Sequence, residues 1–180
     1  MSFLQDLKFL LRGERPTKQY IKMGMQVGTN FNREQGCLLD YPHCWLITIG
    51  NNVTLAPRVQ ILAHDASTKK YLGYTKIGRV TIKDNVFIGA NTTILPNVTI
   101  EENVIIGANS VITKNIPANS VAVGNPAKVI MTTDEYLTKN QQMLNTHPTY
   151  DQSYTIWHNV TNEKKHEMYA ALNNQIGYIE

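Results

Sequence analysis

Hydrophobic and polar positions repeat every six residues in the middle of the chain. Each six opens with isoleucine and carries asparagine in its fourth place, in the runs IKDNVF, IGANTT, ILPNVT, IEENVI, IGANSV and ITKNIP from Ile82 onward. The fifth place is small or β-branched in every run. The runs IGNNVT, LAPRVQ and ILAHDA from Ile49, Leu55 and Ile61 share this pattern, as does an isolated VGTNFN from Val27. Neither a helical period of about 3.6 nor strict alternation accounts for it, so the pattern predicts an all-β solenoid of short strands.

The repeat also predicts where each place in a six lies. The first residue should point inward, and the asparagine should occupy a corner at positive φ, which Asn tolerates at low cost. Three sixes should form one coil, and units eighteen residues apart should stack at about 4.8 Å. IGANTT is therefore expected directly over IGANSV.

The repeat loses its frame twice, by four residues between Val27 and Ile49 and by three between Ile61 and Ile82. A solenoid absorbs such slips by extruding loops on one face, often the binding face. We expect residues 33–48 and 65–76 to form such loops and to wall an active site.

The segments outside the repeat are expected to be largely helical. Residues 1–20 are predicted to form a helical cap, with an amphipathic helix over 1–13, ahead of the solenoid at 21–131. In the tail, 132–180, Thr132-Thr133-Asp134-Glu135 is a capping-box signature for a helix ending near Asn145. A second helix is expected near 162–174.

Composition and charge exclude several classes of protein. The net charge of the 180 residues is +3 and the basic residues are scattered, which argues against nucleic-acid binding. No apolar run reaches the roughly 18 residues of a membrane span, and Asp6 and Lys8 make the N-terminus a poor signal peptide. Cys37 and Cys44 fit neither a zinc site nor a disulfide framework, so we expect buried thiols and a cytoplasmic protein. The phosphate-binding patterns GxGxxG and GxxxxGK[ST] are absent.

His64 is the candidate catalytic residue. Of five histidines it alone lies in a matched repeat, in the fourth place of ILAHDA, immediately before the second slip. Histidine is tolerated at positive φ, and an imidazole beside an extruded loop suits a general base near neutral pH. A surface or packing role is the alternative. Asp65 is one candidate to orient the ring, but neighbouring residues on a strand point oppositely, so a backbone carbonyl or another residue is equally possible.

The repeats and His64 together resemble the hexapeptide-repeat acyltransferases over residues 21–131. The resemblance is strongest to the sugar and xenobiotic branch, which includes galactoside, maltose and capsular-polysaccharide O-acetyltransferases. It implies a left-handed parallel β-helix, acetyl-CoA as co-substrate and a homotrimer with the coenzyme between neighbouring chains. By this resemblance, His64 takes the proton of an acceptor hydroxyl, which attacks the acetyl thioester directly in a ternary complex.

The segment IGANSVITKNIPANSVAVGNPAKVI resembles the end of the family's coenzyme-binding region. This implies a pantetheine groove lined by Ala90, Ala108, Thr113 and Lys114, with Lys128 near the phosphates. Asn97 and Glu101 depart from the pattern, because the family often has glycine there. The acceptor set is expected to be Tyr41, His43, Trp45, Asp65, Tyr71, Tyr74 and Asn85, with the aromatic rings stacking on a sugar. Core packing is an alternative role for Trp45.

Three other functions stay open from the residues. The acceptor is a sugar hydroxyl on the leading hypothesis, but an amino-sugar nitrogen or an antibiotic fits the same chemistry. A γ-carbonic-anhydrase-like enzyme needs three imidazoles on one metal ion. The chain has no histidine between Asp65 and Thr146, so we expect no metal. An inactive scaffold is the third alternative.

Overall fold

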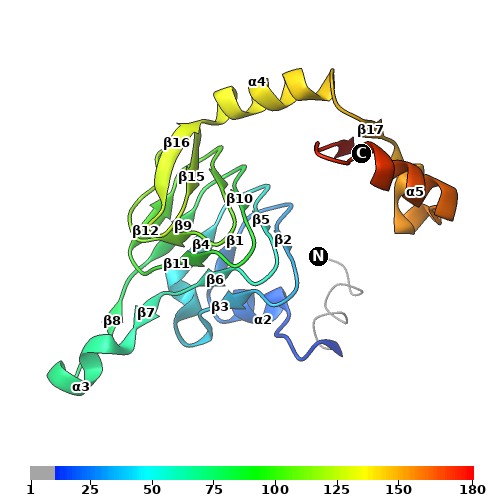
Figure 1. Cartoon of the computed structure of the whole chain (residues 1–180). Helices are drawn as coiled ribbons and strands as arrows, with labels where there is room; N and C mark the ends of the chain where they lie inside the picture. The colour runs from blue at the N-terminus through cyan, green and yellow to red at the C-terminus, as the bar shows by residue number, and fades with distance from the viewer. Residues whose placement is uncertain (1–10) are drawn as a thin grey trace. The chain divides into compact units, whose positions relative to one another are not determined.

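In the computed structural model, which describes residues 11–180, most short strands belong to three sheets (Figure 1). Sheet A contains β1 (Gln26–Val27), β4 (Ile47–Ile49), β9 (Val80–Ile82) and β12 (Val98–Ile100). Sheet B contains β2 (Asn32–Arg33), β5 (Thr54–Leu55), β10 (Phe87–Ile88), β13 (Ile105–Ile106), β15 (Ser120–Val123) and β16 (Lys128–Thr132). Sheet C contains β3 (Leu38–Leu39), β6 (Gln60–Ile61), β11 (Thr93–Ile94) and β14 (Val111–Ile112).

The chain visits sheets A, B and C in rotation, one coil for each round. Strands of successive coils pair in parallel, and Ile88 lies beside Ile106, eighteen residues later. Thr93 pairs with Val111 in the same way on sheet C. The predicted stacking of IGANTT on IGANSV is confirmed. Only the last pair, β15 with β16, is antiparallel among these sheets of the described chain.

The inward places of the repeat form the core. The six isoleucines that open the units are fully buried: Ile82, Ile88, Ile94, Ile100, Ile106 and Ile112. The fifth places are buried too, with exposures of 4% or less: Val86, Thr92, Val98, Val104, Ser110 and Ile116. Fully burying one such aliphatic side chain stabilises a fold by roughly 1.5–3 kcal/mol. Stacking each coil on the next buries these side chains and so stabilises the fold.

The corner asparagines adopt the left-handed backbone that the repeat predicted. Five of them have φ between 57° and 64°: Asn85, Asn91, Asn97, Asn103 and Asn109. Asn115 is an exception, and its side-chain oxygen instead accepts the Thr99 N–H at 2.8 Å. His64 was also expected at positive φ, and this is wrong. It lies in an extended strand paired with Ile77, because the chain leaves the coil at this point.

The glycine in the second place of the IGAN units has a steric cause. A Cβ on Gly89 would lie 2.4 Å from the backbone nitrogen of Ala108, one coil further on. On Gly107 it would lie 2.6 Å from a side-chain methyl of Val123. Adjacent coils approach too closely at this corner for any side chain.

Both frame slips lie in connections that lead from a strand of sheet C to a strand of sheet A. The first is smaller than expected, because β2 and β3 continue the coil and only η1 (Tyr41–Leu46) departs from it. The second forms an antiparallel hairpin, β7 (His64–Asp65) with β8 (Lys76–Ile77), which projects away from the sheets in Figure 1. Between these strands lie η2 (Ala66–Thr68) and α3 (Lys69–Leu72).

The helix α2 (Thr17–Lys22) precedes the first strand and buries Tyr20 in the core. The helix predicted over 1–13 lies largely outside the described residues.

A second compact unit spans Asp134–Glu180. The predicted helices of the tail are confirmed as α4 (Thr133–Leu144) and α5 (Asn162–Ala171). The tail also contains β17 (Thr149–Tyr150), η3 (Gln152–Tyr154), η4 (Ile156–His158) and β18 (Tyr178–Ile179). None of the helices in the described chain is both long and apolar enough to span a membrane.

Candidate active site

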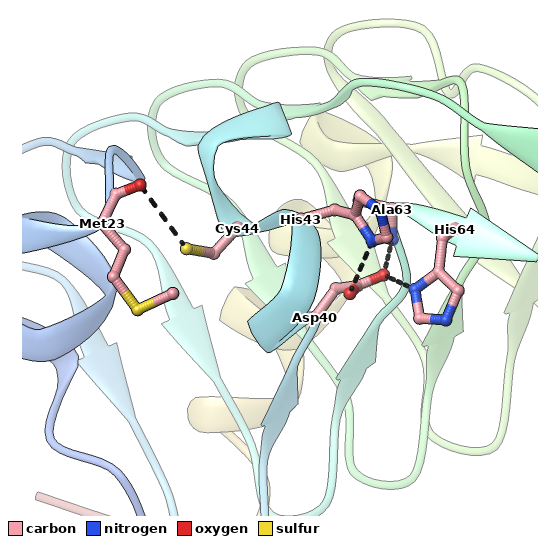
Figure 2. A network of polar contacts seen from close by, with 6 residues as sticks. All are labelled: Met23, Asp40, His43, Cys44, Ala63 and His64. Carbon is pink, nitrogen blue, oxygen red and sulfur yellow. Dashed lines mark hydrogen bonds and ion pairs between the residues drawn. The ribbon is translucent and has the colours of Figure 1, made fainter.

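His64 and Asp40 form a close pair at the corner between sheets C and A (Figure 2). The Nδ1 atom of His64 lies 2.5 Å from Oδ2 of Asp40. Asp40 follows β3, and the backbone N–H of Asp40 donates to Ile61 at 3.0 Å, which aligns the two coils. The N–H of Ala63 donates to the same Oδ2 at 2.7 Å. The Asp40 carboxylate thus contacts both the backbone of Ala63 and the imidazole of the next residue, His64, whose ring it orients.

The pair has a buried end and an open end. The Asp40 side chain is fully buried, whereas 34% of the His64 side chain is exposed. Because the carboxylate faces Nδ1, this nitrogen carries the proton in a neutral ring, and the lone pair is on Nε2. The arrangement can accept a proton at Nε2 from a bound molecule and hold the resulting imidazolium beside a carboxylate.

His43 is the third member of this cluster. Its ring lies 4.9 Å from that of His64, and its Nδ1 is 3.7 Å from Oδ1 of Asp40. The Trp45 ring follows at 5.6 Å from His43 and is 54% exposed. Three rings therefore adjoin one another along the surface, starting at the candidate base.

Asp65 does not orient His64. It forms an ion pair with Lys76 across the hairpin, at 2.6 Å, and accepts the Ser67 N–H at 2.8 Å. The hydrogen bond from Lys76, followed by those from Ser67, lowers the pKa of Asp65 to about 2. This carboxylate stays ionised at neutral pH and links the two strands that carry His64 away from the coil.

The other expected acceptor residues are dispersed. Tyr41 packs edge-on against Tyr20 at 6.1 Å, and the Arg15 guanidinium lies 3.9 Å over its ring. Tyr71 and Tyr74, on the projecting hairpin, are 82% and 80% exposed. Asn85 lies at the corner between sheets A and B, where its amide bonds to neighbouring asparagines. Two of the expected acceptor residues do lie near His64 within one chain. The His43 ring adjoins the His64 ring, and the Trp45 ring adjoins the His43 ring.

The expected coenzyme residues fall at two corners and one strand. Thr113 and Lys114 directly follow β14, at the same corner as His64 but two coils further along. Ala90 and Ala108 lie at the corner between sheets B and C, where Asn109 N–H donates to Ala90. Lys128 begins β16 and is exposed. One chain does not bring all five residues together.

Asp40, His43 and His64 are also the one group of potential metal ligands found in residues 11–180, with atoms within 4.8 Å of one another. The separation of 2.5 Å between His64 and Asp40 is that of a hydrogen bond, which occupies two of the donor atoms.

The two cysteines do not contribute a nucleophile. Burial raises the pKa of Cys37 and of Cys44, so both thiols stay protonated near neutral pH. Cys44 lies within η1, where its thiol contacts the backbone oxygens of Tyr20 and Met23. It fixes η1 on α2 and so supports His43 and Trp45.

Asp40 is the member of the candidate site that the sequence pattern missed. It lies 24 positions before His64, and the first slip hides their relation, since Leu39 pairs with Ile61 at an offset of 22. Asp40 directly follows the inward-pointing Leu39, and an acidic residue at that place was the signal in the sequence that could have identified it.

Three sheets built from six-residue units thus carry a histidine–carboxylate pair at one corner. Residues 79–114 match the family described as bacterial transferase hexapeptide (six repeats). Protein CapG of Staphylococcus aureus is 42% identical over 125 residues, which cover 66% of this chain and 72% of CapG.

Two solved structures are similar to the described fold. A maltose O-acetyltransferase from Clostridium difficile 630 has a TM-score of 0.52 at 37% identity, covering 64% of this chain and 73% of that one. A galactoside acetyltransferase in complex with coenzyme A has a TM-score of 0.53 at 30% identity, with coverages of 68% and 72%. The chain belongs to the bacterial hexapeptide transferase family and is an acetyltransferase of that family.

Proposed function

We propose that the chain moves an acetyl group from acetyl-CoA to a hydroxyl of a sugar or polysaccharide precursor, with His64 as the general base. Acetyl-CoA is the co-substrate. The observation that carries the proposal is the His64–Asp40 pair, which directs Nδ1 to a buried carboxylate and leaves Nε2 for the acceptor. The relation to maltose and galactoside acetyltransferases supports a sugar acceptor.

The reaction needs one proton to move twice. His64 Nε2 takes the proton of the acceptor hydroxyl while the oxygen attacks the carbonyl carbon of the thioester. When the carbon–sulfur bond breaks, the imidazolium returns the proton to the departing sulfur. Asp40 stabilises the imidazolium between these events and keeps Nδ1 protonated throughout. No acyl-enzyme forms, because acceptor and donor are bound together.

Trp45 provides the acceptor platform in this proposal. A hydroxyl at Nε2 of His64 would place the rest of a sugar ring toward the exposed Trp45 ring, whose face suits its C–H groups. Tyr71, Tyr74 and Asn85 would reach such an acceptor from a neighbouring chain.

We also propose that the coil is a left-handed parallel β-helix and that three chains assemble. Ala90 and Ala108 lie at a different corner from Thr113 and Lys114, which supports a groove shared between two copies. Lys128 would contact the coenzyme phosphates there. The free buried thiols and the use of acetyl-CoA favour the cytoplasm as the place of reaction.

Replacement of His64 tests the base. His64→Ala should lower kcat by a factor of about 10²–10⁴ and leave acetyl-CoA affinity within about twofold, because the base contacts the acceptor. Release of free thiol is measured with acetyl-CoA and either maltose or methyl galactoside, and calorimetry gives the affinity.

The matched control is His166→Ala, which removes an exposed histidine of α5 in the second unit. It should behave as the wild type. Equal turnover by His64→Ala and the wild type, with both proteins folded by circular dichroism, would reject His64 as the base.

A further inference from the structure

One oxygen of the buried Asp40 carboxylate has no hydrogen-bond donor in the described chain. Its Oδ2 is used by Ala63 N–H and by His64, but Oδ1 is buried and unpaired. A buried carboxylate oxygen without a donor is strongly disfavoured, and native structures rarely leave one. The carboxylate needs a second partner on this side.

The Nδ1 atom of His43 is likewise buried without a hydrogen-bond partner in the described chain. It lies 3.7 Å from Oδ1 of Asp40. A dashed line in Figure 2 marks this contact between His43 and Asp40. The His43 ring is held between the rings of Trp45 and His64. A kink at His43, with φ of −134° inside η1, turns this side chain toward Asp40. A shift below 1 Å would bring the two atoms to hydrogen-bond distance.

We propose that His43 is a positioning residue whose Nδ1–H donates to Oδ1 of Asp40, so that two imidazoles hold one buried carboxylate from both sides. This rests on the proposed role of His64 as the base. A carboxylate bound at both oxygens cannot rotate, so His64 keeps its ring plane and its Nε2 stays directed at the acceptor. His43 thus acts on the reaction through Asp40 and His64.

Two substitutions at position 43 separate the donor from the ring. His43→Asn keeps an N–H at the place of Nδ1 but loses the aromatic ring, whereas His43→Phe keeps a ring and loses the donor. We expect His43→Phe to lower kcat about tenfold with KM for acetyl-CoA unchanged, as for a lost hydrogen bond to a charged group. His43→Asn should retain kcat within about threefold. Turnover is measured with acetyl-CoA and maltose or methyl galactoside, and with water as acceptor.

The opposite order, with His43→Phe active and His43→Asn impaired, would mean that the ring only packs. Equal loss in both variants, or no loss in either, would also overturn the proposal.

A spectroscopic measurement tests the hydrogen bond without any acceptor. In ¹⁵N-histidine-labelled wild-type protein, we expect His43 to carry its proton on Nδ1, with assignment from the spectrum of His43→Asn. A proton on Nε2 of His43 would overturn the proposal. Because His64 is intact in these samples, failure here differs from failure of the base, which only His64→Ala reveals.

Discussion

A fully buried carboxylate is the most costly single group of the candidate site, and Asp40 shows how the fold makes it tolerable. Removing a carboxylate from water is unfavourable unless hydrogen bonds replace its solvation. Here a backbone N–H and an imidazole, both from one neighbouring coil, bind Oδ2. At the residue scale, the same contacts that compensate for the burial of Asp40 also hold the ring of the proposed base.

Asp65, in contrast, is a more exposed carboxylate whose pKa is set mainly by a local ion pair with Lys76. Lys76, then Ser67, lowers its pKa from 3.8 to about 2. Since the folded value is below the unfolded one, the ionised group stabilises the hairpin above about pH 4, and this contribution is lost as the pH falls to about 2. An NMR titration of the Asp65 carboxyl should give a midpoint near 2 in the wild type.

The matched variant Lys76→Gln should move that midpoint up toward 3.8, because it removes the main cause of the shift. A wild-type midpoint already near 4 would show that the ion pair does not form in solution.

At the scale of elements, one corner of the coil carries a ladder of asparagine side chains. Each amide donates to the next in the order Asn30, Asn52, Asn85, Asn103 and Asn119, at 2.9–3.0 Å. All five also have positive φ. The asparagines between sheets A and B therefore do two things, turning the chain and linking successive coils. Asn91, at the next corner, also turns the chain at positive φ but does not belong to this ladder.

Glycine substitutions should separate these two contributions, because glycine adopts positive φ freely but has no amide. Asn91→Gly is expected to change the free energy of unfolding by no more than about 0.5 kcal/mol. Asn85→Gly should cost about 1–2 kcal/mol, since it removes two ladder bonds.

Chemical denaturation of both variants measures the difference. Asn91→Ala serves as the control for backbone strain and should cost about 1–2 kcal/mol. Equal losses for the two glycine variants would mean that the ladder adds nothing to stability.

At the scale of the whole molecule, the separation of the predicted coenzyme residues has a direct consequence. Thr113 and Lys114 lie at one corner of the coil and Ala90 and Ala108 at another. In the proposed shared groove, a coenzyme that contacts all of them bridges two copies, so binding should require assembly.

We expect light scattering to give three times the 20.3 kDa mass of the chain, and calorimetry to give one acetyl-CoA site per chain with a Kd in the micromolar range. Dilution into monomers should abolish binding. Tight binding by a demonstrated monomer would contradict the shared groove.

The sequence by itself determined the repeat. The isoleucines, corner asparagines and second-place glycines recur at a fixed spacing, so stacking, register and buried core follow from local rules that each unit obeys. It also identified His64, because the catalytic candidate interrupts the pattern. The helices of the tail were predictable from a capping signature, which is again local.

Only the tertiary structure decided what surrounds His64. Asp40 and His43 reach it through coil stacking across a frame slip, and no local pattern records an offset of 24 residues. The extended conformation of His64 arises from pairing with Ile77 beyond an excursion whose shape the repeat does not specify. The repeat fixes positions by periodic packing, whereas the site lies where that period fails and long-range contacts take over.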